Sequence, residues 1–304
     1  MSAPAAGPPV SVVVPDLDSP WIGETFDGLA GQGRAGVDFE VIVVGRDAPG
    51  LVPRDAPGVR FVESDGPLSP AAARNRGVAA ARGRLLLFTD ADCQPFPGWL
   101  PRLARALDAA PVAGGAVTFP RRGNRWALAD NVASFHELLP DRPAEAATRG
   151  PLGSLNLAVT RAAWEAVGPF DEALPTSEDH DWVLRARAAG LATAFEPTAV
   201  VRHAAVRVDR DALVAHARWY GRHFHDFRRR HPEALATGPT WRSRRALAAA
   251  APAKAVAAAL AIFLRHRKEL AGSRAAFPGV VLFKREWYRE IVARWPGANG
   301  EEGG

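Results

Sequence analysis

The sequence predicts an α/β protein: a mostly parallel sheet flanked by helices, followed by a C-terminal helical extension. Two observations indicate this fold class. Short apolar runs without alternation recur in the first third of the chain, and such runs are typical of strands covered on both faces. Helical patterns separate these runs, and an alternation of strand and helix produces a parallel sheet.

The apolar runs define the first strands. They are Val10–Val14, stopped by Pro15, then Phe39–Val44, Val59–Val62 and Leu85–Thr89. The helices expected among them are Trp21–Leu29, Pro70–Ala81 with Ser69 as N-cap and Gly83 just past its end, and a helix after Pro97. Ligands bind at the carboxyl ends of strands in such sheets, where Asp16, Gly45 and Asp90 fall.

The second half of the chain is less regular. Its expected strands are Val112–Phe119, Leu152–Val159, Ala192–Glu196 and Ala199–Arg202, which ends at His203. Its expected helices are Arg161–Val167 and Glu178–Ala189, the second starting at the N-cap Ser177 and ending at Gly190. The polar stretch Arg121–Arg149 fits either an acceptor-binding loop or a plain surface excursion.

The bulk composition narrows the class of protein. A single cysteine among 304 residues excludes a disulfide framework and indicates a reducing cytoplasm. Residues 1–9 have neither a basic flank nor an apolar stretch, so we expect a disordered leader and no signal peptide. The net charge of +5 is concentrated after residue 200, which fits an anionic partner or a solvated helix face. Aromatic residues do not interleave these cations, so nucleic-acid binding is the least favoured reading.

Two apolar segments near the C-terminus raise the question of membrane contact. The run Ala246–Leu264 is long enough to span a bilayer, but Lys254 near its middle is costly, and a packed or interfacial helix is favoured. Its stripe comprises Val256, Leu260, Phe263 and Leu264. A second stripe, Phe283, Trp287, Ile291 and Trp295, fits a membrane surface or, slightly better, docking onto the catalytic domain.

Two carboxylates follow the strand Leu85–Thr89 directly. Asp90 and Asp92 are separated by one alanine, and oxygen-only ligands at a strand end suit a hard divalent ion that also holds phosphate. A solvated turn before the prolines that follow is the alternative. The neighbouring Cys93 is interpreted as a small filler at the strand end.

Several motifs follow one another in a fixed order. They are the first strand with Pro15, the second strand ending at Val44, Ala73-Arg74-Asn75-Arg76-Gly77, Asp90-Ala91-Asp92, Gly168-Pro169-Phe170-Asp171-Glu172, Glu178-Asp179 and His203. This set resembles the family 2 glycosyltransferases, whose catalytic domain has the GT-A fold, a Rossmann-like sheet. The resemblance covers Val10 to Pro232, so we expect a catalytic domain at residues 10–235 and a helical extension at 236–304.

The resemblance implies a role for each matched residue. Asp90 would contact the donor ribose or a metal-bound water, and Asp92 would bind Mg²⁺ or Mn²⁺ bridging the donor diphosphate. His203 would provide a third metal ligand, and Arg74 would lie near the nucleotide. Asp179 would be the general base of an inverting sugar transfer to an acceptor glycan, lipid-linked or small-molecule hydroxyl, with Glu178 orienting the site. Helix N-capping is the alternative role of that acidic pair.

The chain departs from the family pattern at two strand ends. Gly45-Arg46-Asp47 stands where two acids are usual, so UDP specificity is in doubt and Asp47 is a candidate substitute. Asp16-Leu17-Asp18 follows Pro15, and either acid could contact the nucleotide. Two other functions stay open: a degenerate sugar-binding or scaffold protein, and a nucleotidyltransferase, which would not require an acid pair on a late helix.

Overall fold

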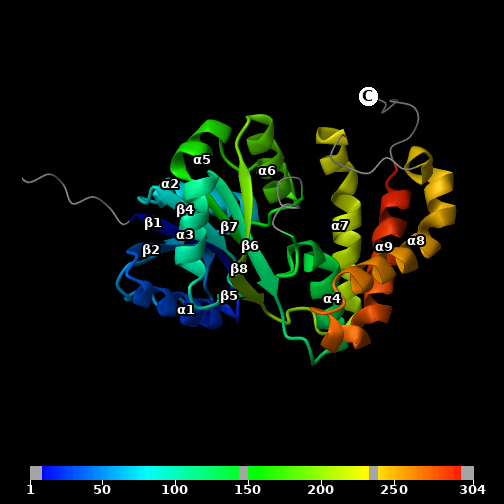
Figure 1. Cartoon of the computed structure of the whole chain (residues 1–304), viewed down its shortest axis with the longest axis horizontal. Helices are drawn as coiled ribbons and strands as arrows, with labels where there is room; N and C mark the ends of the chain where they lie inside the picture. The colour runs from blue at the N-terminus through cyan, green and yellow to red at the C-terminus, as the bar shows by residue number, and fades with distance from the viewer. Residues whose placement is uncertain (1–8, 144–149, 233–238, 296–304) are drawn as a thin grey trace, which may run out of the picture. The chain divides into compact units, whose positions relative to one another are not determined.

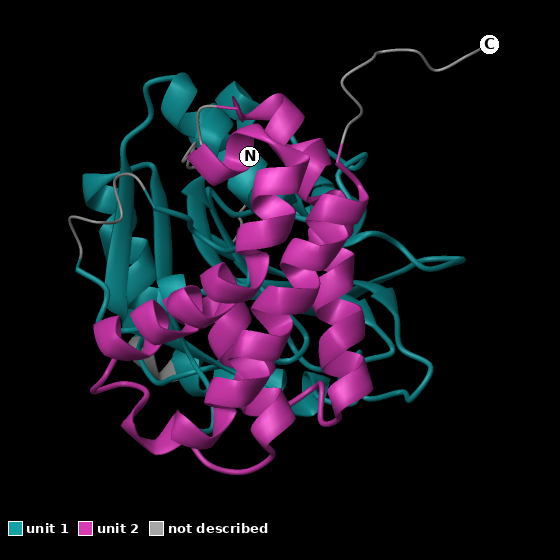
Figure 2. Ribbon diagram, turned by 90° about the vertical axis from the view of Figure 1, so that its right-hand side faces the viewer, with its two compact units in different colours: residues 1–120, 137–204 teal, residues 121–136, 205–304 magenta. Residues whose placement is uncertain are grey.

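The computed structural model describes residues 9–143, 150–232 and 239–295. The chain forms two compact units (Figure 2). Unit 1 comprises Met1–Pro120 and Glu137–Ala204, and unit 2 comprises Arg121–His136 and Ala205–Gly304. The expected domain boundary at residue 235 lies outside the described residues. Of the expected leader, only Pro9 lies within the described residues.

Unit 1 is built on an eight-stranded sheet in the order β3-β2-β1-β4-β7-β6-β8-β5 (Figure 1). The strands are β1 (Val10–Leu17), β2 (Phe39–Arg46), β3 (Val59–Glu63), β4 (Leu85–Thr89), β5 (Cys93–Pro95), β6 (Val112–Thr118), β7 (Asn156–Thr160) and β8 (Thr193–His203). Pairing is parallel from β3 to β4 and between β6 and β8. It is antiparallel where β7 joins β4 and β6, and between β5 and β8. The α/β class is confirmed, and the sheet is mixed.

Helices cover this sheet because the strands are apolar on both faces. Successive residues of β1 from Val10 to Val14 are all buried, so each face of the sheet needs a cover. Helix α2 packs on β1 and β2, and α3 packs on β6, β7 and β8. The helices of unit 1 are α1 (Ile22–Ala30), α2 (Pro70–Ala80), α3 (Trp99–Ala109), α5 (Arg161–Val167) and α6 (Glu178–Ala188).

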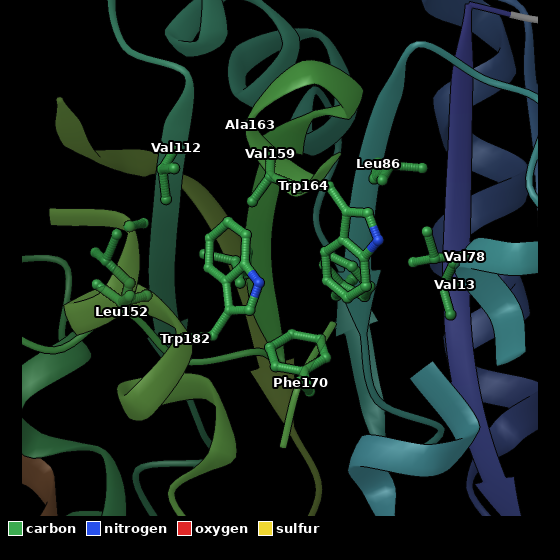
Figure 3. Close-up of a cluster of buried hydrophobic side chains, with 14 of the residues drawn as sticks. Val13, Val78, Leu86, Val112, Leu152, Val159, Ala163, Trp164, Phe170 and Trp182 are labelled. Atoms are coloured by element: carbon green, nitrogen blue, oxygen red, sulfur yellow. The ribbon is translucent and has the colours of Figure 1, made fainter. Parts of the chain in front are cut away.

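An aromatic cluster fixes α5 and α6 against the sheet. The indole rings of Trp164 and Trp182 are stacked at 5.7 Å, and the Phe170 ring contacts both of them (Figure 3). Trp182 and Phe170 are almost fully buried. Because α6 begins at Glu178, this packing sets the position of the acidic pair at its first turn.

Some expected boundaries were wrong, and each has a local reason. Pro15 does not stop β1, since pairing with β2 continues to Leu17 after pairing with β4 has ended at Val13, and proline is tolerated where a strand has one neighbour. Gly83 does not cap α2, which ends in extended backbone at Ala81. A Cβ at Gly83 would lie 2.6 Å from the Ser11 nitrogen, so close approach to β1 requires glycine.

Other differences concern the second half of the chain. The two strands expected at Ala192–Arg202 are one strand, β8, whose register with β6 shifts after Gly115. The side chain of Ser177 makes no capping hydrogen bond to α6. The strand expected at Leu152 starts only at Asn156. The segment Arg121–Arg149, expected to be irregular, contains a helix.

Unit 2 is helical in its described residues. Its α-helices are α4 (Arg125–Phe135), α7 (Arg210–Arg230), α8 (Arg244–Arg265) and α9 (Phe277–Ala293). Helix α9 packs against α4, α7 and α8 (Figure 1). Phe283 and Ile291 are buried among these helices, so part of the second apolar stripe lies in the core of unit 2. By length and composition, α8 is the one described helix that could cross a membrane.

Candidate active site

Asp16 lies at the carboxyl end of β1 and is almost completely buried, with 5% of its surface exposed. Its Oδ1 accepts a hydrogen bond from the Ser19 N–H at 3.1 Å. Its Oδ2 is buried and has no hydrogen-bond partner within the described part of the chain. Burial raises the pKa of Asp16 to about 6, opposed by the Ser19 N–H and assisted by the negative charges of Asp47 and Asp18.

Asp18 and Asp47 hold the backbone beyond these strand ends. Asp18 accepts from the Ala48 N–H at 2.8 Å and pairs with Arg46 at 3.0 Å. Asp47 uses one carboxylate oxygen for the Leu51 N–H and the other for the Val52 N–H. Both aspartates therefore have local structural partners, whereas one oxygen of Asp16 has none among the described residues.

The departure from the family pattern at Gly45 has a steric cause. Gly45 has φ +138°, and a Cβ there would lie 1.9 Å from the Asp16 carbonyl oxygen. The β1–β2 pairing places these two residues directly opposite each other. An acidic residue at position 45 would therefore push the two strands apart.

Arg74 of α2 joins two acidic positions that are far apart in the sequence. Its Nη2 donates to Asp90 Oδ1 at 2.6 Å and its Nη1 donates to Glu178 Oε1 at 2.7 Å. The Arg74 side chain is 3% exposed and that of Glu178 is 9% exposed. Since bonds of this length between full charges are strong when buried, Arg74 fixes the end of β4 relative to the start of α6.

The two carboxyl groups that pair with Arg74 have raised pKa values. Burial raises the pKa of Glu178 to about 7, with repulsion from Asp179 adding to the rise and the Arg74 guanidinium opposing it. Burial also raises the pKa of Asp90, opposed by Arg74 and assisted by Asp92. Burial is thus the largest cause of both rises, and the neighbouring carboxylates add to it.

Asp92 and His203 lie together where β5 pairs with β8. The His203 Nε2 and the Asp92 Oδ2 are 3.5 Å apart, and the Ala204 N–H donates to the Asp92 carbonyl at 2.9 Å. The His203 Nδ1 lies 2.9 Å from the Ala204 carbonyl oxygen. With Nδ1 as the donor, Nε2 presents a lone pair beside the carboxylate, an arrangement common in metal-binding histidines.

This pair fits a divalent cation as a partial site. Asp92 is about a quarter exposed and supplies oxygen, and His203 supplies nitrogen. Among the described residues, no cluster of three or more histidine, cysteine or acidic side chains has the geometry to enclose a metal by itself. Ions of the Mg²⁺ type typically take one or two carboxylates together with substrate phosphates and water, so a partial site is sufficient.

Asp179 is held by a residue that the sequence patterns did not identify. The Ser154 N–H and the Ser154 hydroxyl both donate to Asp179 Oδ2, at 2.8 and 3.2 Å. Asp179 Oδ1 accepts from the His180 N–H. Ser154 precedes β7, and its only sequence signal was the glycine before it, where a Cβ would collide with Leu155 and Leu138.

Asn75 links two of the sequence motifs, Ala73–Gly77 and Gly168–Glu172, by hydrogen bonds. Its side chain donates to the Phe170 carbonyl at 2.9 Å and accepts from the Phe170 N–H at 3.0 Å. It also donates to Glu172. The turn Gly168–Glu172 is therefore tied by three hydrogen bonds to α2, the helix that carries Arg74.

Cys93 is fully buried, and burial with the nearby charges of Asp92 and Asp90 raises the pKa of its thiol. These properties agree with a filler at the strand end and not with a nucleophile.

Part of the chain is similar to a known family of enzymes. Residues 11–154 match the model of the family described as Glycosyl transferase family 2. This segment, slightly less than half of the chain, is therefore similar to glycosyltransferase family 2. It is 32% identical over 138 residues to glycosyltransferase AglE of Haloferax volcanii, covering 44% of each chain. It is 32% identical over 174 residues to the pre-mycofactocin glycosyltransferase of Mycobacterium tuberculosis, covering 55% of this chain and 36% of that protein.

The fold is shared with solved structures of GT-A glycosyltransferases. The mannosyltransferase PcManGT from Pyrobaculum calidifontis, solved with GDP-Man and Mn²⁺, superposes with a TM-score of 0.57 at 22% identity, over 91% of this chain and 86% of that one. TarS of S. aureus superposes with a TM-score of 0.51 at 18% identity, over 74% of this chain and 43% of the TarS chain. The match extends over most of the chain, but the curated relatives are each matched over less than half of their length.

Proposed function

We propose that this chain is an inverting glycosyltransferase that moves a sugar from a nucleotide-diphosphate donor to an acceptor hydroxyl. One observation carries the proposal. Arg74 holds Asp90, at the end of the central strand β4, to Glu178, which neighbours Asp179 at the start of α6. A donor site and a general base are thereby built into one rigid frame, within the family that residues 11–154 identify.

The donor nucleotide would lie over the carboxyl ends of β1 and β4. Asp16 and Asp90 lie at the ends of these neighbouring strands, and one buried Asp16 oxygen, which has no partner among the described residues, would accept from a ribose hydroxyl or a base N–H. Asp47 is less suited because both of its oxygens accept backbone N–H groups. Pro15 and Asp18 would shape this edge, Asp18 by bridging to Arg46 and Ala48.

Asp92 and His203 would hold Mg²⁺ or Mn²⁺. The donor set of one carboxylate and one imidazole fits either ion, and the fold neighbour PcManGT was solved with Mn²⁺. When bound, such a cation neutralises the charge of the departing nucleoside diphosphate. Proton transfer and the orientation of the acceptor would be carried out by side chains of the protein.

Asp179 would act as the general base. Its Oδ2 is fixed by two donors from Ser154, so the carboxylate is oriented before the acceptor arrives. It would take the proton of the acceptor hydroxyl as that oxygen bonds to the anomeric carbon and the bond to the diphosphate oxygen breaks. A single displacement inverts the anomeric configuration. Glu178, held by Arg74, would orient this turn of α6.

The test measures donor binding and donor hydrolysis with UDP-, GDP- and dTDP-sugars, with and without Mn²⁺, in the wild type and Asp92→Asn. Asp108→Asn, at an exposed position near the end of α3, is the matched control. We expect one donor class to bind in a metal-dependent way, the Asp92 variant to lose that dependence, and the control to retain it. If no nucleotide sugar binds to the wild type with or without metal, the proposal fails and a degenerate sugar-binding or scaffold protein becomes the better reading.

Product analysis tests the stereochemistry separately. Proton NMR of the first sugar product would show inversion for a single displacement at Asp179. A product with retained configuration would contradict the assignment of Asp179 as base while leaving sugar transfer intact.

A further inference from the structure

Helix α8 presents an uncharged apolar face to solvent. Val256, Leu260 and Leu264 recur every four residues, and 42%, 47% and 71% of their respective surfaces are exposed. The opposite side of the helix, including Ala255 and Ile262, is buried in unit 2. The exposed stripe is therefore not the side of α8 that packs on α9, and a contiguous apolar face of this kind indicates a binding partner.

All the charged side chains in the segment that carries this face are cationic. Residues 234–268 contain no aspartate or glutamate. Their cations are Arg242, Arg244, Arg245, Lys254, Arg265, Arg267 and Lys268. All except Lys254 lie at the two ends of α8, and Lys254 is positioned over the Trp241 ring at 5.9 Å. The apolar face is thus flanked by positive charge at both ends.

A shallow groove continues the face beyond the end of α8. It has a volume of about 330 Å³ and is lined by Leu260, Phe263, Leu264, Leu270 and Phe277 together with Arg267 and Arg274. Phe263 and Phe277 meet edge to face at 5.5 Å at its floor. An apolar recess with two exposed guanidinium groups beside it suits an acyl chain below an anionic head group.

We propose that α8 lies on an anionic lipid bilayer with Val256, Leu260 and Leu264 inserted among the acyl chains. Charge complementarity selects this partner: the flanking cations attract anionic head groups, and the uncharged stripe enters the hydrocarbon boundary. A second copy of this chain fits less well, because a two-fold contact through α8 would bring two identical basic segments together. The inference stands apart from the proposed function, since it needs no donor turnover.

Vesicle co-sedimentation of the full chain tests the inference. We expect binding to vesicles of equal parts phosphatidylcholine and phosphatidylglycerol, and much weaker binding to phosphatidylcholine alone. Leu260→Glu combined with Leu264→Glu should lower partitioning by more than about tenfold, because two inserted side chains become charged. Arg267→Gln and Arg274→Gln should each lower it by about fivefold.

Leu51→Glu is the matched control, since Leu51 lies in unit 1 and is 44% exposed, close to the value for Leu260. It should bind vesicles like the wild type, and circular dichroism should show that all variants are folded. The inference is overturned if the wild type binds neither vesicle, or if the double glutamate variant binds like the wild type. Resistance to an alkaline carbonate wash would also overturn it by indicating a spanning helix. A concentration-dependent dimer dispersed by Leu260→Glu would overturn it in favour of self-association.

Discussion

Replacing Asp16 by asparagine should stabilise the free protein at neutral pH. The Asp16 pKa rises from 3.8 to about 6 on folding, because the carboxyl is buried and faces other acids. Since the folded-state pKa is raised, the folded protein favours the protonated form, and stability is lost as the pH rises from about 4 to about 6. Two pKa units correspond to about 3 kcal/mol. Asparagine stays neutral and keeps the Oδ1 acceptor for the Ser19 N–H, so it should recover most of this energy.

Urea denaturation of the metal-free protein measures the effect. We expect Asp16→Asn to be more stable by about 3 kcal/mol near pH 7.5 and by less than about 1 kcal/mol near pH 4. The exposed Asp27→Asn in α1 should change stability by less than about 0.5 kcal/mol at both pH values. An equal gain at both pH values, or a loss at neutral pH, would refute the electrostatic reasoning. Donor binding should weaken in the same variant, as expected when a functional carboxylate is kept at the expense of stability.

Arg74→Met should destabilise the fold by about 3–5 kcal/mol in urea, because Glu178 and Asp90 lose their buried partner, whereas Arg76→Met on the exposed side of the same helix should cost little. Equal losses for the two variants would argue against the ion-pair account. Gly45→Ala should cost more than about 2 kcal/mol through collision with the neighbouring strand, and Gly50→Ala, which meets no atom within 4 Å, should cost less. Asp179→Asn should lower kcat by about 10²–10⁴ and leave the donor Kd unchanged, as checked by calorimetry and steady-state kinetics. A normal kcat in this variant would remove the proposed base.

The sequence predicted the parallel half of the sheet well because its signals are local. The apolar run Leu85–Thr89 corresponds to β4, and the helix after Pro97 corresponds to α3. Helix α4 was missed because several of its buried positions are alanines and two are the polar Asp130 and Asn131, which leave no apolar periodicity. Asp130 is satisfied by His216 and Arg207 of unit 2, partners that no local pattern reveals.

The expected active-site residues all lie in unit 1, and several of them meet in pairs. The sequence indicated the right residue types, but the bridge from Arg74 to both Asp90 and Glu178 depends on how α2 and α6 pack. The apolar stripe of α8 was also visible in the sequence. Its outward orientation was not, because the buried side is formed mainly by alanines such as Ala255 and Ala259, with Leu247 and Ile262 toward the two ends.

Position 45 has a glycine where the resemblance leads us to expect an acidic residue, and motif comparison alone does not reveal the reason. A missing acid suggests either lost activity or a substitute nearby in sequence, such as Asp47. In the structure β1 extends past Pro15 and brings the Asp16 carbonyl against position 45, so no side chain fits there. The same extension carries the Asp16 carboxyl to the strand end with one oxygen unpartnered among the described residues. The pairing of Asp16 with Gly45 thus leaves no room for a side chain at position 45 and places a carboxylate on the adjacent strand.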